Sequence, residues 1–217
     1  MSNDQAGGSV IRGDGAVSMK GSENAAHYDE LADDYDRQLH EWGYEAPERG
    51  AGFLADNLEG FAEARILDCG CGTGMTGQAL RAAGAKGEIT GVDVSTHSLE
   101  LAAAKNVYDA TREVDLNKRL PFDDRSFDGV LCVGVLSYVE AEPLFREWAR
   151  IVRPGGVVVF TCREDFFEPR GYPGLLEALE REGKWAPVSV TEPLPYLALH
   201  ADFADKIGVI YGIFRIG

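Results

Sequence analysis

A short apolar run that leads into a glycine-rich turn constrains this chain more than any other feature. Ile66-Leu67-Asp68 has the character of the end of a buried strand, and Gly70, Gly72 and Gly74 follow at alternate positions. Glycines in such a turn let the backbone approach a ligand closely and adopt positive φ. A helix that starts here would direct free N–H groups and its positive dipole end at that ligand. The segment therefore predicts a strand–turn–helix unit that binds a nucleotide-like ligand.

A second carboxylate ends the next expected strand. Asp93 closes the run Ile89-Thr90-Gly91-Val92-Asp93, about twenty residues after the glycine turn. An acid at that place can accept hydrogen bonds from both hydroxyls of a ribose. The turn and the acid, in this order, predict an adenosine-containing cofactor. NAD is the main alternative, but its G-x-G-x-x-G/A fingerprint needs a small residue where this chain has Met75.

The chain around the turn alternates between short apolar runs and stretches with helical periodicity. Strands are expected at residues 65–69, 88–94, 112–115, 127–134 and 157–163. Helices are expected between them at residues 74–83, 96–107 and 142–152. Apolar strands separated by helices indicate a parallel sheet that is covered on both faces. The predicted fold class is therefore α/β, with a single Rossmann-like doubly wound sheet.

The C-terminal part departs from this alternation. A helix is expected at residues 175–182, closed by Gly183 as a left-handed residue. Two further strands are expected at residues 186–191 and 208–216, with no helix between them. Without a crossover helix these two strands should pair antiparallel. We therefore predict seven strands, with an antiparallel hairpin strand at the C-terminal end.

The length of 217 residues suits one domain. Residues 1–23 are rich in Gly, Ser, Asn and Asp and are expected to form a flexible tail, followed by one domain at residues 24–217. Within that domain, residues 24–60 are expected to form N-terminal lid helices, because apolar side chains recur on one helix face. Residues 164–206 are expected to contain substrate-lid segments, since they have no regular crossover role.

The turn with Asp68 before it resembles motif I of class I S-adenosylmethionine-dependent methyltransferases, and the resemblance runs from Tyr28 to Phe214. Asp115-Leu116 resembles the pair that lies beside the adenine in that family. Arg153-Pro154-Gly155-Gly156 resembles the turn before its fifth strand. More narrowly, segments such as 179–185 resemble the methyltransferase type 11, Williams-Beuren syndrome region methyltransferase-like group.

The resemblance implies S-adenosyl-L-methionine as the cofactor and S-adenosyl-L-homocysteine as the product. Methyl transfer from the sulfonium is an in-line displacement, and the aromatic-rich lid segments favour a small-molecule acceptor. The resemblance also implies that the cofactor is bound by Tyr28, Tyr35, Asp68, Gly70, Gly72, Gly74, Asp93, Val94, Asp115, Leu116 and Val133. The leaving group is a neutral thioether, so no acid is needed to expel it. A base is needed only if the nucleophile arrives protonated, and His200 is the first candidate for that role.

The amino-acid composition argues against several classes of binding partner. The chain has 36 acidic and 21 basic residues, a formal net charge of -15, which repels phosphate backbones and argues against nucleic acid. No run approaches the ~20 apolar residues that span a bilayer, and no leader is recognisable, so we expect a cytoplasmic protein without a membrane partner. The four cysteines match neither a disulfide framework nor a metal site, because Cys69-Gly70-Cys71 is C-x-C and lacks an answering pair.

Several alternatives stay open at this point. Oxygen, nitrogen, sulfur and carbon acceptors share this scaffold, because a fold does not fix a function. A protein methyltransferase and a non-catalytic S-adenosylmethionine-binding protein have the same cofactor motifs. The sequence is compatible with a monomer or a homodimer.

Overall fold

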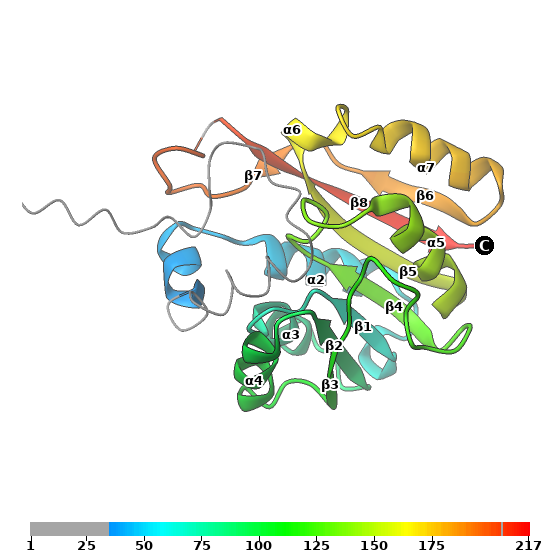
Figure 1. Ribbon diagram of the computed structural model, residues 1–217, viewed down its shortest axis with the longest axis horizontal. Coiled ribbons are helices and arrows are strands. Elements are labelled where there is room, and N and C mark those ends of the chain that lie inside the picture. Colours follow the sequence, from blue (N-terminus) through cyan, green and yellow to red (C-terminus); the bar gives the residue numbers. More distant parts are fainter. Residues whose placement is uncertain (1–34, 205) are drawn as a thin grey trace, which may run out of the picture.

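The computed structural model describes residues 35–204 and 206–217. Its centre is an eight-stranded sheet in the order β3-β2-β1-β4-β5-β8-β6, with β7 paired to β8 (Figure 1). The strands are β1 (Ile66–Cys69), β2 (Ile89–Asp93), β3 (Ala110–Glu113), β4 (Phe127–Cys132), β5 (Val152–Arg163), β6 (Trp185–Val190), β7 (Leu194–Pro195) and β8 (Gly208–Ile216). The predicted α/β doubly wound fold is confirmed.

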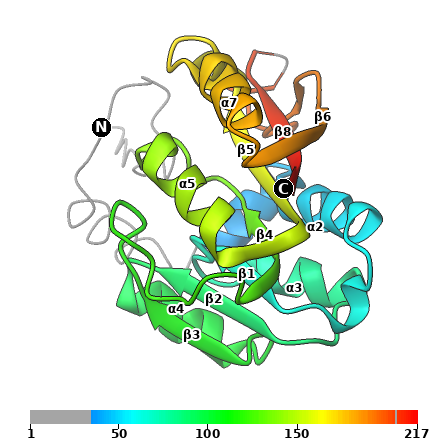
Figure 2. The ribbon, with the colours of Figure 1, turned by 90° about the vertical axis from the view of Figure 1, so that its right-hand side faces the viewer.

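Helices cover both faces of the sheet (Figure 2). The structure has α2 (Ala46–Asn57), η1 (Phe61–Glu63), α3 (Met75–Ala82), α4 (Thr96–Ala104), α5 (Ala141–Ile151), α6 (Glu164–Phe167) and α7 (Tyr172–Arg181), and residues 35–41 form an N-terminal helix. Neighbouring residues of β4 serve opposite faces: Val130 packs in the cluster with α5 and α7, and Leu131 in the cluster with α2 and α3. Strands buried on both sides explain the near-continuous apolar runs in the sequence.

The parallel register decides where the carboxyl ends of the strands lie. β1 pairs with both β2 and β4, with Asp68 opposite Gly91 on one side and Leu131 on the other. The turn that follows β1 and the acid that ends β2 therefore emerge at the same edge of the sheet. Ligands bind at this edge in doubly wound folds.

The C-terminal strands pair antiparallel, as predicted, but their arrangement adds two features. β8 lies between β5 and β6 and pairs antiparallel with both. The predicted number of seven strands is too low, because the two-residue strand β7 also pairs with β8. β5 begins at Val152, five residues before the predicted start, because the expected turn at Arg153–Gly156 continues as strand.

Two helices in the C-terminal part also differ from expectation. The segment after β5, where the sequence predicts a substrate lid but no helix, begins with the short helix α6 (Glu164–Phe167). The next helix, α7, begins at Tyr172 rather than Leu175, with Pro173 in its first turn, where a missing N–H costs nothing. The expected tail at residues 1–23 and Tyr28 lie outside the described residues. Among the described residues, no helix combines the length and apolar character needed to cross a bilayer.

An aromatic cluster fills the core between the sheet and helices α5 and α7. Phe160 on β5 is fully buried, with ring centroids 4.9 Å from Phe145 on α5 and 5.9 Å from Phe214 on β8. Trp185 lies against Phe214 at 4.6 Å, so the first residue of β6 joins the same cluster. This packing attaches the antiparallel end of the sheet to its parallel part.

We expect Phe160→Ala to lower the free energy of unfolding by about 3–5 kcal/mol, because it removes a large buried ring and leaves a cavity. Urea unfolding followed by circular dichroism measures the change. Val188→Ala, on the exposed side of β6, is the control and should change stability by no more than about 0.5 kcal/mol. A loss below about 1 kcal/mol for Phe160→Ala would contradict the proposed role of the aromatic cluster.

Candidate cofactor site

The glycine turn after β1 is held by hydrogen bonds to the end of β2. The backbone N–H groups of Gly70 and Cys71 both donate to the carbonyl oxygen of Val92, at 2.8 and 2.9 Å. Gly70 has a φ of +74°, and a Cβ built there would lie 2.2 Å from the side chain of Val135. Glycine is therefore required at this position by both conformation and space.

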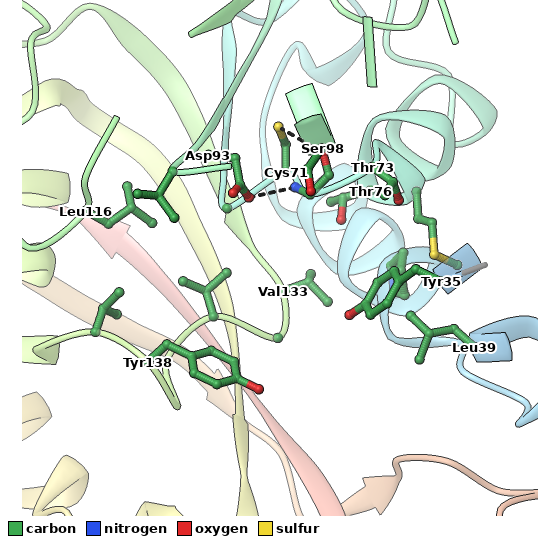
Figure 3. Close-up of a pocket in the computed structure, with 18 of the residues that line it drawn as sticks. Tyr35, Leu39, Cys71, Thr73, Thr76, Asp93, Ser98, Leu116, Val133 and Tyr138 are labelled. Atoms are coloured by element: carbon green, nitrogen blue, oxygen red, sulfur yellow. Dashed lines mark hydrogen bonds between the residues drawn. The ribbon is translucent and has the colours of Figure 1, made fainter. Parts of the chain in front are cut away.

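Asp93 connects the turn to the segment that follows β2. Its Oδ2 accepts from the N–H of Gly72 at 2.9 Å, and its Oδ1 accepts from the N–H of Ser95 at 3.0 Å. Ser95 in turn caps α4, since its hydroxyl oxygen accepts from the N–H of Ser98. One carboxylate thus fixes the glycine turn relative to the start of α4, and it does so at the cavity wall (Figure 3).

A largely apolar cavity opens where the turn, the ends of β2 and β4 and the N-terminal helix meet. The described residues that line it are Tyr35, Leu39, Tyr44, Pro47, Gly70, Cys71, Gly72, Thr73, Met75, Thr76, Asp93, Val94, Ser98, Val114, Asp115, Leu116, Asn117, Val133, Gly134, Val135, Tyr138, Val139 and Tyr196. The charged side chains among them are Asp93 and Asp115. The cavity therefore has a negative character that suits a cationic or hydroxyl-bearing ligand.

Most residues predicted to bind the cofactor meet at this cavity. Tyr35, Gly70, Gly72, Asp93, Val94, Asp115, Leu116 and Val133 line it. Asp68 and Gly74 are not part of the described lining: Asp68 is fully buried beside the turn, and Gly74 precedes the first residue of α3. Tyr28 lies outside the described residues.

Asp115, a partly exposed residue of the cavity wall, is held in its ionised form. Partial burial would raise the pKa of its carboxyl, but the N–H of Asn117 at 3.0 Å and the ammonium of Lys118 at 3.2 Å lower this pKa below its usual range. The carboxylate is therefore an acceptor at neutral pH. Its neighbour Leu116 is buried and adds an apolar wall.

Four tyrosines that come from separate segments line the cavity. They are Tyr35, Tyr44, Tyr138 and Tyr196. The rings of Tyr44 and Tyr196 meet edge to face, with centroids 5.7 Å apart. Burial raises the pKa of Tyr35, Tyr44 and Tyr196, so these hydroxyls are protonated at neutral pH. Tyr44 and Tyr138 were not predicted, because each lies in a loop with no local pattern.

The N-terminal helix (residues 35–41) is attached to the glycine turn by Asp36. Its Oδ1 accepts from the hydroxyl of Thr73 in the turn, and its Oδ2 accepts from the ammonium of Lys105 at the end of α4. Tyr35, the preceding residue, thereby comes to the cavity wall. The sequence placed both residues in a lid helix but gave no signal for the contact of Asp36.

His200 lies away from the described lining of the cavity. Its ring meets Trp42 edge-on at 4.6 Å and Phe203 at 5.1 Å, and its Nδ1 accepts from the N–H of Asp202. These contacts give His200 a packing role at the outer side of the N-terminal helix. Its role as a base stays a prediction.

The two cysteines of the turn are neutral thiols. Burial raises the pKa of Cys69 to about 12, and it raises that of Cys71 further. The indole N–H of Trp148 donates to the Sγ atom of Cys69 at 3.3 Å, which accounts for its place in the core. In the part of the chain that the structure describes, no three His, Cys, Asp or Glu side chains gather as a metal site requires.

The fold and the site define a doubly wound domain that binds an adenosine-type ligand, and the comparisons with known proteins specify its family. A family model described as a methyltransferase domain matches residues 67–160. Ubiquinone biosynthesis O-methyltransferase of Neisseria meningitidis serogroup C is 32% identical over 180 residues, which cover 73% of each chain. The chain belongs to the class I S-adenosylmethionine-dependent methyltransferases.

Other relatives match less than two thirds of their own length. Methyltransferase-like protein 27 of Homo sapiens is 35% identical over 164 residues, which cover 73% of this chain and 66% of that protein. A ubiquinone biosynthesis O-methyltransferase of Alkalilimnicola ehrlichii is 33% identical, over 50% of this chain and 45% of that protein. Family membership therefore does not carry over the reaction of either protein.

Solved structures share the fold. An S-adenosylmethionine dependent methyltransferase from Mesorhizobium loti, 25% identical, matches with a TM-score of 0.59 over 75% of this chain and 95% of its own. The [4+2]-cyclase SpnF, 20% identical, matches with a TM-score of 0.69 over 93% of this chain and 98% of its own. The second likeness shows the fold alone, and its name shows that this fold also supports a cyclase.

We expect Thr73→Val to release the N-terminal helix from the glycine turn, because valine keeps the shape and removes the hydroxyl that donates to Asp36. Amide hydrogen exchange in residues 35–41 should become about fivefold faster or more, since such a bond to a carboxylate contributes about 1–2 kcal/mol. His40→Ala, on the exposed side of the same helix, is the control and should leave the exchange rates unchanged. Equal rates in Thr73→Val and wild type would contradict the attachment.

Proposed function

We propose that this protein transfers a methyl group from S-adenosyl-L-methionine to a small-molecule acceptor and releases S-adenosyl-L-homocysteine. The observation that carries the proposal is the position of Asp93. Its carboxylate ends β2 at the wall of the cavity and already holds the glycine turn through Gly72. A ribose diol at this wall would find an acceptor that the fold keeps in a fixed orientation.

The residues present fit the cofactor of the family. Asp93 would hold the ribose, Asp115 and Leu116 would hold the adenine, and Gly70 and Gly72 leave the backbone open to the rest of the molecule. When bound, S-adenosyl-L-methionine supplies a methyl group on a positively charged sulfur. The negative character of the described wall favours such a cation.

The chain contributes alignment of the reacting groups and exclusion of water, and no acid is needed because the leaving group is a neutral thioether. The walls of the cavity include apolar side chains such as Leu39, Val133 and Val135, which keep water from the reacting atoms. The tyrosine hydroxyls at the other end offer hydrogen bonds that orient an acceptor for in-line attack. Tyr35, Tyr44 and Tyr196 serve as neutral hydrogen-bonding groups, because burial keeps them protonated.

Two lines of support favour a small acceptor. The four tyrosines and the N-terminal helix enclose the cavity from several segments, which suits a molecule that enters it whole. The names of two groups of relatives, the ubiquinone biosynthesis and malonyl-[acyl-carrier protein] O-methyltransferases, refer to O-methylation. The absence of a nucleic-acid partner, the cytoplasmic location and the monomeric or homodimeric state stay predictions.

We expect S-adenosyl-L-homocysteine to raise the melting temperature by about 5–10 °C at a hundredfold excess over Kd, because a ligand that binds only the folded state stabilises it by mass action. Asp93→Ala should abolish this shift. Asp56→Ala, which removes an exposed carboxylate on α2, is the matched control and should retain it. If neither S-adenosyl-L-methionine nor its product shifts wild-type melting at millimolar concentration, the cofactor assignment is wrong.

The acceptor is tested with methyl-labelled S-adenosyl-L-methionine and a metabolite extract. We expect the label in a low-molecular-weight product that mass spectrometry identifies, and Asp93→Ala should not form it. Label that enters protein bands of a lysate and no small molecule would contradict the proposed substrate class. Cofactor binding without any labelled product would contradict the enzymatic proposal.

A further inference from the structure

Tyr108, which precedes β3, lies in a slot that glycines leave open beneath the turn. A Cβ built on Gly77 of α3 would lie 2.4 Å from the Tyr108 side chain, and one on Gly91 of β2 would lie 3.0 Å from it. A Cβ on Gly74 would also approach the ring, at 3.3 Å. The ring is therefore wedged between α3 and β2, and the glycines at these positions are explained by the space it needs.

The hydroxyl of Tyr108 connects α3 to the buried carboxylate of Asp68. The N–H of Gly77 donates to the tyrosine oxygen at 3.0 Å, and the tyrosine O–H donates to Oδ2 of Asp68 at 2.7 Å. Because the oxygen accepts from Gly77, its proton is directed at Asp68. Among the described residues no donor reaches Oδ1 of Asp68, which is fully buried.

The ionised form of Asp68 is stabilised by the hydrogen bond from the Tyr108 hydroxyl. Burial raises the pKa of Asp68, the hydrogen bond from Tyr108 lowers it, and the nearby charge of Asp93 raises it, so that the three effects together raise this pKa to about 7. The other titratable neighbours are the thiols of Cys69, Cys71 and Cys132, whose pKa values burial raises, so they stay neutral. Burial also raises the pKa of Tyr108, so its hydroxyl stays a donor.

We propose that Tyr108 is a positioning residue of the cofactor site, which holds the Asp68 carboxylate beneath the glycine turn and so strengthens binding of the cationic cofactor. The proposal rests on the proposed function only through cofactor binding. Asp68 lies two residues before Gly70, which lines the cavity, so its negative charge attracts the ammonium group that the cofactor and its product share.

The affinity for the cofactor should decrease as the pH falls, because Asp68 loses its negative charge. Above pH 7 the Asp68 carboxylate is ionised and attracts the cofactor, and this attraction is lost as the pH falls through about 7. Without the Tyr108 hydroxyl the charged form loses its donor, so the pKa of Asp68 rises. The loss of affinity then begins at a higher pH.

The first experiment reads the carboxyl of Asp68 directly in ligand-free protein. Carbon-13 NMR of labelled aspartate carboxyls is followed against pH, and Asp68→Asn identifies the signal by its disappearance. We expect a midpoint near 7 in wild type. Tyr108→Phe, which keeps the ring in its slot, should move that midpoint upward by about one pH unit or more, because it removes a hydrogen bond to a charged group.

Tyr211→Phe is the matched control, because it removes another buried tyrosine hydroxyl, one that has no hydrogen-bond partner among the described residues. It should leave the midpoint of Asp68 unchanged. A midpoint that Tyr108→Phe also leaves unchanged would overturn the proposal.

The second experiment measures Kd for S-adenosyl-L-homocysteine by calorimetry between about pH 6 and 8.5, a range that brackets the midpoint expected for Asp68. Wild-type affinity should fall by up to about fivefold from pH 7 to 6, and the curve for Tyr108→Phe should be displaced to higher pH. For Asp68→Asn, Kd should not change with pH over this range. In that background, Tyr108→Phe should not shift the dependence of Kd on pH.

Failure of the proposal for Tyr108 and failure of the proposed function give different results. A uniform loss of affinity in Tyr108→Phe at every pH would assign the residue a packing role only and overturn the proposal. Wild-type protein that binds no S-adenosyl-L-homocysteine at any pH would overturn the proposed function and the link to the cofactor. The carboxyl titration tests the connection between Tyr108 and Asp68 separately, because it is read without ligand.

Discussion

The hydrogen bonds between the glycine turn and the end of β2 determine the geometry of everything around the cavity. Backbone N–H groups of Gly70 and Cys71 converge on one carbonyl of β2, and Gly72 donates to Asp93. These contacts require the turn to pass close to Val135, which only glycine permits. Because the same turn leads into α3, the direction of that helix and the wall it contributes are set by the register between β1 and β2.

The N-terminal helix covers the cavity at the edge of the parallel sheet. It is held there by hydrogen bonds and an ion pair as well as by apolar packing. Asp36 accepts from Thr73 in the turn and from Lys105 at the end of α4, so the N-terminal helix is fixed to both elements that flank the cofactor side. Leu39 of the same helix packs with Phe203 from the far end of the chain. Segments distant in sequence thus close the cavity over a wall that the sheet provides.

The cofactor side could be predicted from the sequence, because its determinants are local. A buried strand, a glycine turn and an acid at the next strand end follow each other along the chain, and Gly70 and Asp93 meet as expected. Tyr108 could not be predicted, since its partner Asp68 lies forty positions earlier and is reached only after folding. The position of β8 between β5 and β6 could not be predicted either. An apolar strand pattern indicates that a strand is buried, but it does not indicate which strands pair with it.

Two kinds of chain segment form the wall of the cavity, and they differ in how freely they can change. The glycine turn and the strand ends form one part of the cavity wall, and changing them would disturb the register of the sheet. Tyr44, Tyr138 and Tyr196 line the cavity from connecting segments, which can change without altering any strand pairing. The [4+2]-cyclase SpnF has the same fold, so the fold by itself does not determine the reaction. On the proposed function, we expect the choice of acceptor to depend on the side chains of these connecting segments.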